Sequence, residues 1–465
     1  MLGILQDDIV TPFLSLQEVR LKRQTKEPKE PPGQDLLKLL LQCRFRKASD
    51  PRDKIYSLLG LVAGANSNPL VAPTPTHLPL EIRPDYSSPV GAVYTHVAQQ
   101  MIIASNTLDV LGGCESSRVT PATTPGPDVP SWVPDWSAAQ TASPLLHDAL
   151  GQHRTTHATS HSKALVQFIN SGSITLIIHA HEVATFTALA PPLMKPIYNT
   201  AEATDKQCKE IDGLGAIYSE DGELLKFTGN VLGTLWKGEV EMFKLFMDIV
   251  PFLGTFSEWE TFATAVPSTN PRGPGVTKSE SSSDPSPNNA TTALDIPSPR
   301  DDEEPEDHLT LYWQTLCTGT YDNTEAGISE RCRKIATQKM FYGWRASLKP
   351  IYDLHRWKAD RKLRVIGLVS YIVKTYREFS EFARFLDCCY GRRLGRAANG
   401  YLCLAPEDAK VGDKVILAKG GRVPLVVRQD SGDSGYWRFV GEAYVHGIMD
   451  GEVWEEDMYK EFKVR

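Results

Sequence analysis

Apolar side chains at helical spacing predict a short helix near residue 55. Ile55, Leu58 and Leu59 fall on one face of this helix. Asp50 is a suitable N-cap, Pro51 suits the first helical position, and Gly60 is a residue type at which helices commonly end. The helix is therefore expected to begin directly after Asp50.

A second amphipathic helix is predicted after residue 88. Ser88 is a suitable N-cap and Pro89 suits the first helical position. Its apolar positions recur every three or four residues and define a face directed at the core, namely Val90, Val93, Val97 and Met101. Further helical segments are expected at 230–250 and 371–390.

The pattern changes to strands in the central and C-terminal parts of the chain. Residues 173–186 are rich in β-branched and apolar side chains, and are the best strand candidate before the C-terminal part. Short apolar runs separated by glycine-containing turns then predict strands at 401–404, 414–417, 424–428, 436–440 and 444–449. Such regular spacing favours a small antiparallel barrel, and we expect residues 173–186 to share its sheet.

Composition divides the chain further. Residues 266–308 are rich in Pro, Ser, Asn and acidic residues, and we expect disorder there because so few apolar groups cannot offset the entropy of ordering. The prediction is an α+β protein in five parts: helical residues 1–63, a central α+β region at 64–265, the disordered linker at 266–308, a helical segment at 309–399 and a β-rich module at 400–465.

Bulk properties exclude some classes of function. The 465 residues are 41% hydrophobic and 23% charged, which is ordinary for a globular protein. The net charge of −7 argues against binding to nucleic acid. We expect no membrane span, because no run of 18 apolar residues occurs. None of the eight cysteines forms a C-x-x-C pair and no secretory signal opens the chain, so a cytoplasmic location is expected.

Three motifs suggest chemistry, and each has a simpler interpretation. Residues 432–435 (GDSG) resemble a serine-protease motif but lie where a hairpin turn is required. His179 and His181 would face the same side of a strand, yet no third metal ligand is identifiable. Another set recurs at four-residue steps in a segment that is a poor helix former: His153, His157 and His161. We therefore predict no catalytic, cofactor-binding or metal-binding residue.

Several sequence blocks occur in a fixed order along the chain. They are DPRDKIYSLLGL at 50–61, PDYS at 84–87, PSWVPDWS at 130–137, GYLCLAP at 400–406, Gly412-Asp413, PLVVR at 424–428 and GEAYVHGIMDGE at 441–452. Together they resemble the fungal heterokaryon-incompatibility proteins, the HET-domain family. The joint order makes this resemblance specific, and it frames nearly the whole chain.

One departure from the family pattern affects what the resemblance implies. In the family these blocks follow, or end, an N-terminal HET domain that carries a Trp-Ile-Asp stretch and a Cys-Ile-Asn-Gln stretch. Neither stretch occurs here, so residues 1–63 are expected to be only the trailing edge of that domain. A truncated gene model, a fragment and a paralogue that kept the regulatory half all stay open.

The resemblance implies a non-enzymatic interaction or regulatory protein, with a protein partner, in non-self recognition and controlled cell death. The alternative is a fragment of an enzyme-like effector that consumes NAD or a nucleotide, as suspected for TIR-like folds, with its active part upstream of Met1. Some residues of the first two blocks could be active-site groups on family grounds, but their context favours a structural role: Arg52, Asp53, Asp85 and Tyr86. Trp132 and Trp136 are expected to fill the core.

Overall fold

The computed structural model describes residues 32–44, 46–62, 80–114, 128–138, 142–146, 156–171, 173–193, 216–218, 224–227, 254–265, 308–319, 336–356, 382–432 and 435–465. The chain divides into two compact units. The first consists of Met1–Pro192, Thr261–Tyr321 and Phe385–Arg465, and the second of Leu193–Glu260 and Asp322–Arg384. Helices and a β-barrel are both present, which confirms the predicted α+β class.

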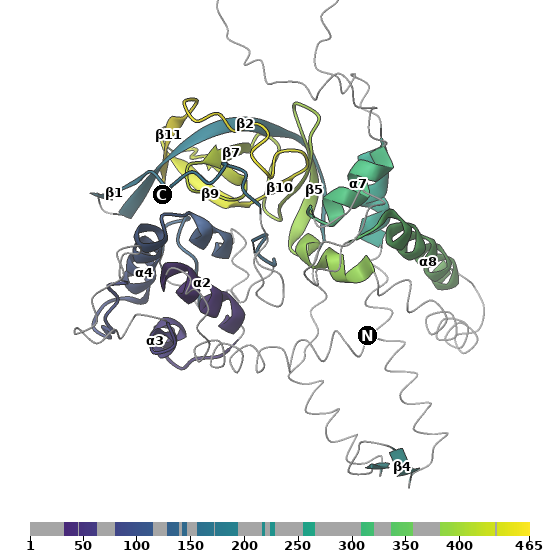
Figure 1. Cartoon of the computed structure of the whole chain (residues 1–465), viewed down its shortest axis with the longest axis horizontal. Helices are drawn as coiled ribbons and strands as arrows, with labels where there is room; N and C mark the ends of the chain where they lie inside the picture. The colour runs from purple at the N-terminus through teal and green to yellow at the C-terminus, as the bar shows by residue number, and fades with distance from the viewer. Residues whose placement is uncertain are drawn as a thin grey trace, which may run out of the picture. The chain divides into compact units, whose positions relative to one another are not determined.

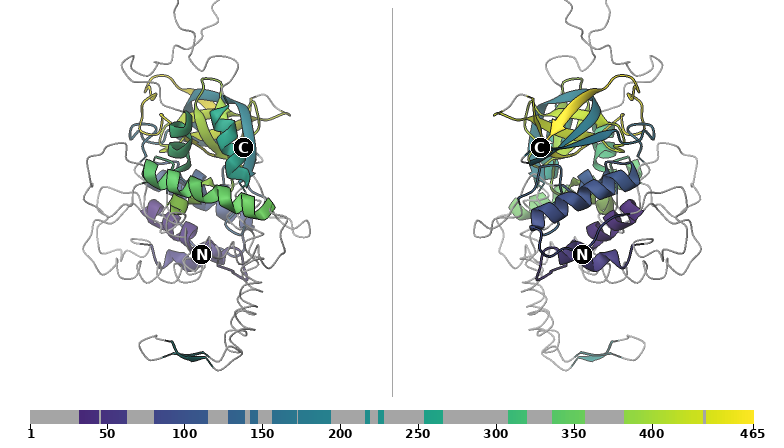
Figure 2. Two further views of the ribbon diagram at one scale, coloured as in Figure 1. Left: turned by 90° about the vertical axis from the view of Figure 1, so that its right-hand side faces the viewer. Right: turned by 90° about the vertical axis from the view of Figure 1, so that its left-hand side faces the viewer.

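Helices form one layer of the first unit (Figures 1 and 2). They are α2 (Pro32–Cys43), α3 (Asp53–Leu59), α4 (Val90–Ser105) and the 3₁₀ helix η1 (Asp109–Gly113). α2 packs against the other three. Buried side chains recur at helical spacing on the packed faces, among them Leu36, Leu40, Val97 and Met101. The face predicted for the second helix is thus the one that is buried.

α3 begins later than the sequence predicted. Its first residue is Asp53 and its N-cap position is Arg52, whereas Asp50 and Pro51 were expected to fill these roles. The Asp50 carboxylate instead accepts hydrogen bonds from the backbone N–H and the Nε of Arg52, at 2.9 Å each. Its oxygens are therefore occupied by a residue that precedes the helix.

α4 also begins one residue later than predicted. Pro89 occupies the N-cap position and Val90 is the first helical residue. No side chain caps the helix, and the Ser88 hydroxyl donates instead to the Asp85 carboxylate at 2.6 Å. At the other end the helix stops at Asn106, whose left-handed backbone (φ 54°) is one that asparagine tolerates well.

Five strands of the first unit close into a barrel (Figure 1). They are β2 (Ser173–Leu193), β7 (Lys414–Ala418), β8 (Leu425–Gln429), β9 (Trp437–Glu442) and β11 (Lys460–Val464). β2 pairs with both β7 and β11, so the strand predicted at 173–186 does share a sheet with C-terminal strands. β11 and β9 run parallel, which departs from the antiparallel arrangement that we predicted.

Further strands extend this sheet beyond the closed ring. β5 (Arg392–Ala397), β6 (Leu402–Pro406) and β10 (Tyr444–Val445) follow β2 in that order, and β1 (Val166–Ser171) forms an antiparallel hairpin with β2. β5 lies within the part 309–399 that was predicted to be helical, so the β-rich module begins before residue 400. Its sequence, RRLGRA, does not alternate between apolar and polar residues. Arg392 and Arg393 can lie in this strand because their side chains donate to carbonyl oxygens of other segments.

The barrel interior is filled by apolar side chains from its alternating positions. The buried cluster includes aliphatic and aromatic residues from four of the strands, namely Phe186, Val415, Leu417, Val426 and Val440. η1 of the helical layer lies against β9. The hydrophobic core is therefore shared between the central region of the sequence and the C-terminal module.

The second unit has an aromatic core. α8 (Gln338–Arg356) contributes Phe341 and Trp344, and the Trp344 ring lies 5.2 Å from those of both Phe256 and Phe382. Arg345 of α8 forms an ion pair with Glu260. A two-stranded antiparallel pair, β3 (Ala216–Tyr218) and β4 (Leu224–Phe227), also falls within the bounds of this unit.

Some sequence predictions fall outside the described residues. The helix expected at 230–250 and the linker at 266–308 do so, except for His308, where α7 (His308–Leu316) begins. Only the end of the helix predicted at 371–390 is described, and it includes the 3₁₀ helix η2 (Arg384–Cys389). Among the described residues, no helix is long and apolar enough to cross a membrane.

Candidate functional site

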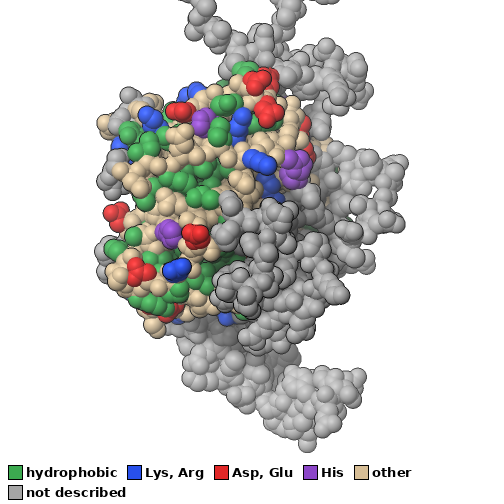
Figure 3. Space-filling model, turned by 60° about the vertical axis from the view of Figure 1, so that its left-hand side comes forward, with side chains coloured by type: hydrophobic (Ala, Val, Ile, Leu, Met, Phe, Trp, Pro, Cys, Tyr) green, Lys and Arg blue, Asp and Glu red, His purple; other side chains and the backbone are tan. Residues whose placement is uncertain are grey.

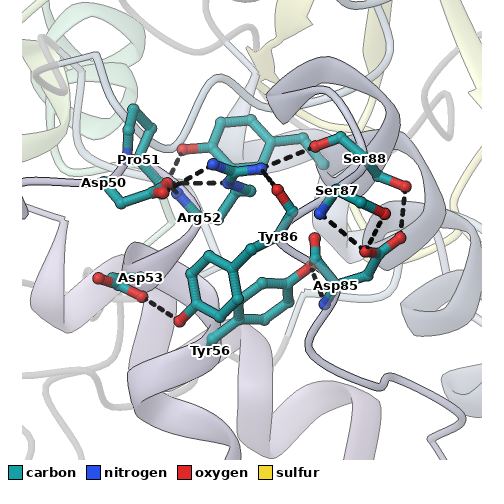
Figure 4. Close-up of polar contacts among 10 residues, drawn as sticks. Asp50, Pro51, Arg52, Asp53, Tyr56, Asp85, Tyr86, Ser87 and Ser88 are labelled. Atoms are coloured by element: carbon teal, nitrogen blue, oxygen red, sulfur yellow. Dashed lines mark hydrogen bonds and ion pairs between the residues drawn. The ribbon is translucent and has the colours of Figure 1, made fainter.

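The DPRDK and PDYS blocks meet on the surface of the first unit, where α3 and α4 begin (Figure 4). Arg52 is the centre of this arrangement. Its Nη1 donates to the backbone carbonyls of Tyr86 and Ser88, and its Nη2 lies 2.7 Å from the Asp50 carboxylate. Both chain segments are thus held by one guanidinium group.

Two tyrosines complete the contact. The Tyr86 hydroxyl donates to Asp53 at 2.5 Å, and the Tyr56 hydroxyl donates to the carbonyl of Asp85 at 3.1 Å. The Tyr56 and Tyr86 rings meet edge to face at 5.3 Å, and the Arg52 guanidinium lies 5.3 Å from the Tyr86 ring centre. We call Asp50, Arg52, Asp53, Tyr56, Asp85 and Tyr86 the arginine–tyrosine cluster.

The ionisation of the cluster follows from these hydrogen bonds. Asp85 accepts from the Ser87 and Ser88 hydroxyls and from the Ser87 backbone N–H, which lowers the pKa of Asp85 to about 2. The hydrogen bond from Arg52 lowers the pKa of Asp50. Donation to Asp53 raises the pKa of Tyr86. At neutral pH the carboxylate of Asp85 is charged and the Tyr86 phenol keeps its proton.

These contacts hold the two segments against each other. The structural role in helix capping and helix entry that the sequence context favours for these residues stays a prediction. Every hydrogen bond described above joins residues of the two blocks or Ser88, which directly follows the second block. One part of the cluster stays accessible, because the Tyr86 residue is 53% exposed. Sequence reasoning identified residues of both blocks, but it did not predict that the two blocks would meet.

The tryptophans of the PSWVPDWS block lie in the core, as predicted. Trp132 is fully buried and Trp136 nearly so. Arg44, which sequence reasoning missed, holds this block in place: its Nη2 donates to the Asp135 carbonyl at 2.8 Å, and its guanidinium lies 5.4 Å from the Trp136 ring centre. No motif marked Arg44, although a buried arginine always requires several acceptors.

The histidine motifs do not assemble a metal site in the part of the chain that the structure describes. His179 lies on β2 and contacts the Leu165 carbonyl and Glu461, while His181 is 9% exposed. His157 and His161 are neighbours whose ring centres lie 3.6 Å apart, and their segment is a turn rather than a helix. Within the described ranges, no group of three or more His, Cys, Asp or Glu side chains could hold a metal ion.

Two ion pairs, one fully buried and one partly buried, tie distant segments together, and sequence reasoning did not identify them. Glu442 of the GEAYVHGIMDGE block pairs with Arg392 at 2.8 Å, with both side chains at most 4% exposed. Arg422 pairs with Asp109 at 2.6 Å. The signal for Glu442 was its position inside an otherwise apolar run, which a carboxylate can occupy only with a buried partner.

The segment 432–435 lies in the connection between β8 and β9, where a turn was predicted; Asp433 and Ser434 are outside the described residues.

The C-terminal part of the chain is similar to a known protein family. Residues 358–464 match the family model of the Het-6 beta-barrel domain. A segment of 75 residues is 43% identical to "Heterokaryon incompatibility protein 6, OR allele" of Neurospora crassa. This segment covers 15% of the present chain and only 11% of the length of that relative. No solved structure matches.

Proposed function

This chain is related through its Het-6 β-barrel domain to the fungal heterokaryon-incompatibility proteins, and we propose that it is a regulatory binding protein of that system. It would take part in non-self recognition and in the control of the cell death that follows incompatible fusion. We propose that it acts by binding a protein partner and not by catalysis. We also propose a cytoplasmic location, where thiols such as those of the buried Cys43, Cys389 and Cys403 stay reduced.

The exposed ring of Tyr86 is the observation that carries this proposal. Tyr86 is 53% exposed, yet it is fixed by a hydrogen bond to Asp53 and by ring contacts with Arg52 and Tyr56. Tyrosine and arginine are enriched among the residues that dominate binding energy at protein interfaces. A ring that is already immobilised loses little entropy when a partner covers it.

The polar groups of the cluster are already hydrogen-bonded to one another, and this favours binding of a partner over catalysis. Asp85 accepts three hydrogen bonds, and the low pKa that results leaves it a weak base at neutral pH. Arg52 contacts two carbonyls and one carboxylate. A substrate would have to displace these contacts before it could use the groups, whereas a partner that covers the Tyr86 ring would not.

Expression in a fungal host tests the proposal. Strains that express the wild-type chain are expected to change the growth arrest that follows fusion with an incompatible tester strain. Tyr86→Ala is expected to abolish this effect, because the ring is lost. Tyr86→Phe keeps the ring and loses only the hydrogen bond to Asp53, so it is expected to retain the effect.

Two results would contradict the proposal. If folded Tyr86→Ala protein acted like wild type, the cluster would not be the recognition surface. If the purified wild-type chain consumed NAD or a nucleotide, the protein would be an enzyme and the non-enzymatic proposal would fail. Circular dichroism of each variant, recorded beside the growth assay, separates loss of binding from loss of folding.

A further inference from the structure

Within the described ranges, the hairpin strand β1 leaves one edge of the sheet without a covering strand. β1 pairs with β2 through residues 166–171, and among the described strands it has no second neighbour. In the closed ring, by contrast, each strand is paired on both sides. β1 lies at the margin of the barrel in Figure 1, where no other ribbon runs along its outer side. Its outer backbone N–H and C=O groups are thus available for pairing with a further strand.

β1 lacks the features by which proteins usually protect such an edge. Natural edge strands carry charged residues, proline or a bulge, which hinder pairing with other chains. The six residues of β1, VQFINS, include neither a charge nor a proline, and their register with β2 has no bulge. Ile169 is 41% exposed on this strand. The edge is therefore competent to accept another strand.

The hairpin is also held rigidly. The Phe168 ring of β1 lies 5.7 Å from the buried Trp132 ring, and the Trp132 Nε1 donates to the Ile174 carbonyl of β2 at 3.1 Å. Both strands of the hairpin are thereby fixed to the core of the first unit. A pre-organised edge loses little entropy on pairing, so backbone hydrogen bonds there translate more fully into affinity.

We propose that β1 pairs with β1 of a second copy of this chain, antiparallel and about a two-fold axis perpendicular to the sheet. Such an axis preserves the two faces of the sheet, so the side chains of Gln167 and Ile169 lie opposite the same set in the other copy. Like charges directly opposite one another destabilise such pairs, and β1 brings none. A strand of a different protein would not need this neutrality, which is why a second copy is the occupant that fits.

The surroundings of the edge agree with a contact between copies. Leu165, directly before β1, is 43% exposed, which adds to the apolar surface of Ile169. Figure 3 turns this side of the molecule forward and shows hydrophobic side chains gathered in a band between groups of charged ones. The proposed interface contains no residue of the arginine–tyrosine cluster, so it stands or falls independently of the proposed function.

Sedimentation equilibrium of the full chain over a range of concentrations tests the inference. The wild type is expected to form dimers. The double variant Gln167→Lys/Ile169→Lys places like charges opposite one another, and should raise the dimer dissociation constant at least about tenfold. Gln167→Glu/Ile169→Glu should do the same. An equimolar mixture of the two variants should form dimers again, because opposite charges then face each other across the two-fold axis.

A substitution of an exposed isoleucine outside β1 is the control. Ile103→Lys changes an isoleucine on α4 with a similar exposure, 42%, and is expected to leave the dimer intact. A wild type that stays monomeric at its solubility limit overturns the inference. So do dimers that persist in the β1 double variants, or a β1 edge that binds a different protein while the chain itself remains monomeric.

Discussion

Glu442 is a single carboxylate on which three segments of the first unit converge. Its Oε1 accepts from Arg392 Nη2 at 2.8 Å and from the backbone N–H of Leu145, and Arg392 Nη1 donates to its carbonyl at 2.6 Å. Space around it is tight, because a Cβ placed on Gly112 would lie 2.8 Å from Oε2. These contacts join η1, residues 142–146 and strands β5 and β9, which makes Glu442 important to stability rather than to chemistry.

Removing the charge of Glu442 should therefore be costly. Glu442→Gln leaves the Arg392 guanidinium buried without a counter-charge, and the expected loss in the free energy of unfolding is about 3–5 kcal/mol. Urea denaturation of the full chain measures it. In the Arg392→Met/Glu442→Gln double variant no buried charge remains, so a large part of this loss should be recovered. A double variant that is as unstable as the sum of both single variants would contradict this explanation.

The protonation of His157 is expected to make the stability of the fold depend on pH. Burial, together with the nearby His161 and Arg422, lowers the pKa of His157 below its ordinary value of 6.5, although Asp109 opposes this effect. The unfolded chain therefore binds a proton more readily than the folded chain as the pH falls through about 6.5, and stability should decrease below that pH. His157→Gln should reduce this decrease in urea denaturation at pH 7.5 and 5.5. His96→Gln, on the exposed side of α4, is the control for a His-to-Gln substitution elsewhere in the first unit. The burial of His181 lowers its pKa as well, so a part of the slope should persist in His157→Gln.

At the scale of elements, the β1–β2 hairpin depends on Trp132. Trp132→Phe removes the hydrogen bond to the Ile174 carbonyl and reduces the ring contact with Phe168. The expected cost is about 1–3 kcal/mol, and it should fall on the hairpin rather than on the whole unit. Hydrogen exchange followed by mass spectrometry should show faster exchange in residues 166–178, with unchanged exchange in β8 and β9. A uniform increase across the barrel would show that Trp132 supports the entire core instead.

Sequence patterns predicted some of these elements correctly and misplaced or missed others. The apolar spacing of Val93, Val97 and Met101 predicted the buried face of α4 correctly, because burial itself produces that spacing. The first residues of α3 and α4 were misplaced, because the oxygens of Asp50 and Ser88 are engaged by side chains of the adjacent segments. β5 was missed because its arginines are satisfied by tertiary contacts that no local pattern records.

At the scale of the whole molecule, the sequence predicted a small barrel but not its order of strands. Turn residues separate strands along the chain, whereas pairing joins β2 to β7 and β11, more than two hundred residues away. The parallel pair β11–β9 has no local signal at all. For the arginine–tyrosine cluster, the residue types were visible in the sequence, but the meeting of Arg52 with Tyr86 depends on how α3 and α4 pack. Pairing across long separations is thus the information that a single sequence does not supply.

The strands of the closed barrel come from two separate parts of the sequence. The segment that matches the Het-6 barrel family, residues 358–464, contains β7, β8, β9 and β11 but lacks β2, which closes the ring between β11 and β7. Without β2, both neighbouring strands would expose an open edge, and Phe186 would be absent from the interior. Residues 358–464 alone should therefore fail to fold, with no cooperative transition in thermal circular dichroism.

The matched comparison is the full chain, which adds Trp132, the β1–β2 hairpin and η1, which lies against β9, and should show a cooperative transition. Ile178→Lys in that longer chain places a charge at a position of β2 that is 1% exposed, so it should abolish the transition without shortening the chain. Cooperative unfolding of residues 358–464 alone would contradict the prediction, since it would mean that the C-terminal strands close a barrel among themselves. The expected result would instead make the barrel a joint product of two distant parts of the sequence, with β2 as the strand that joins them.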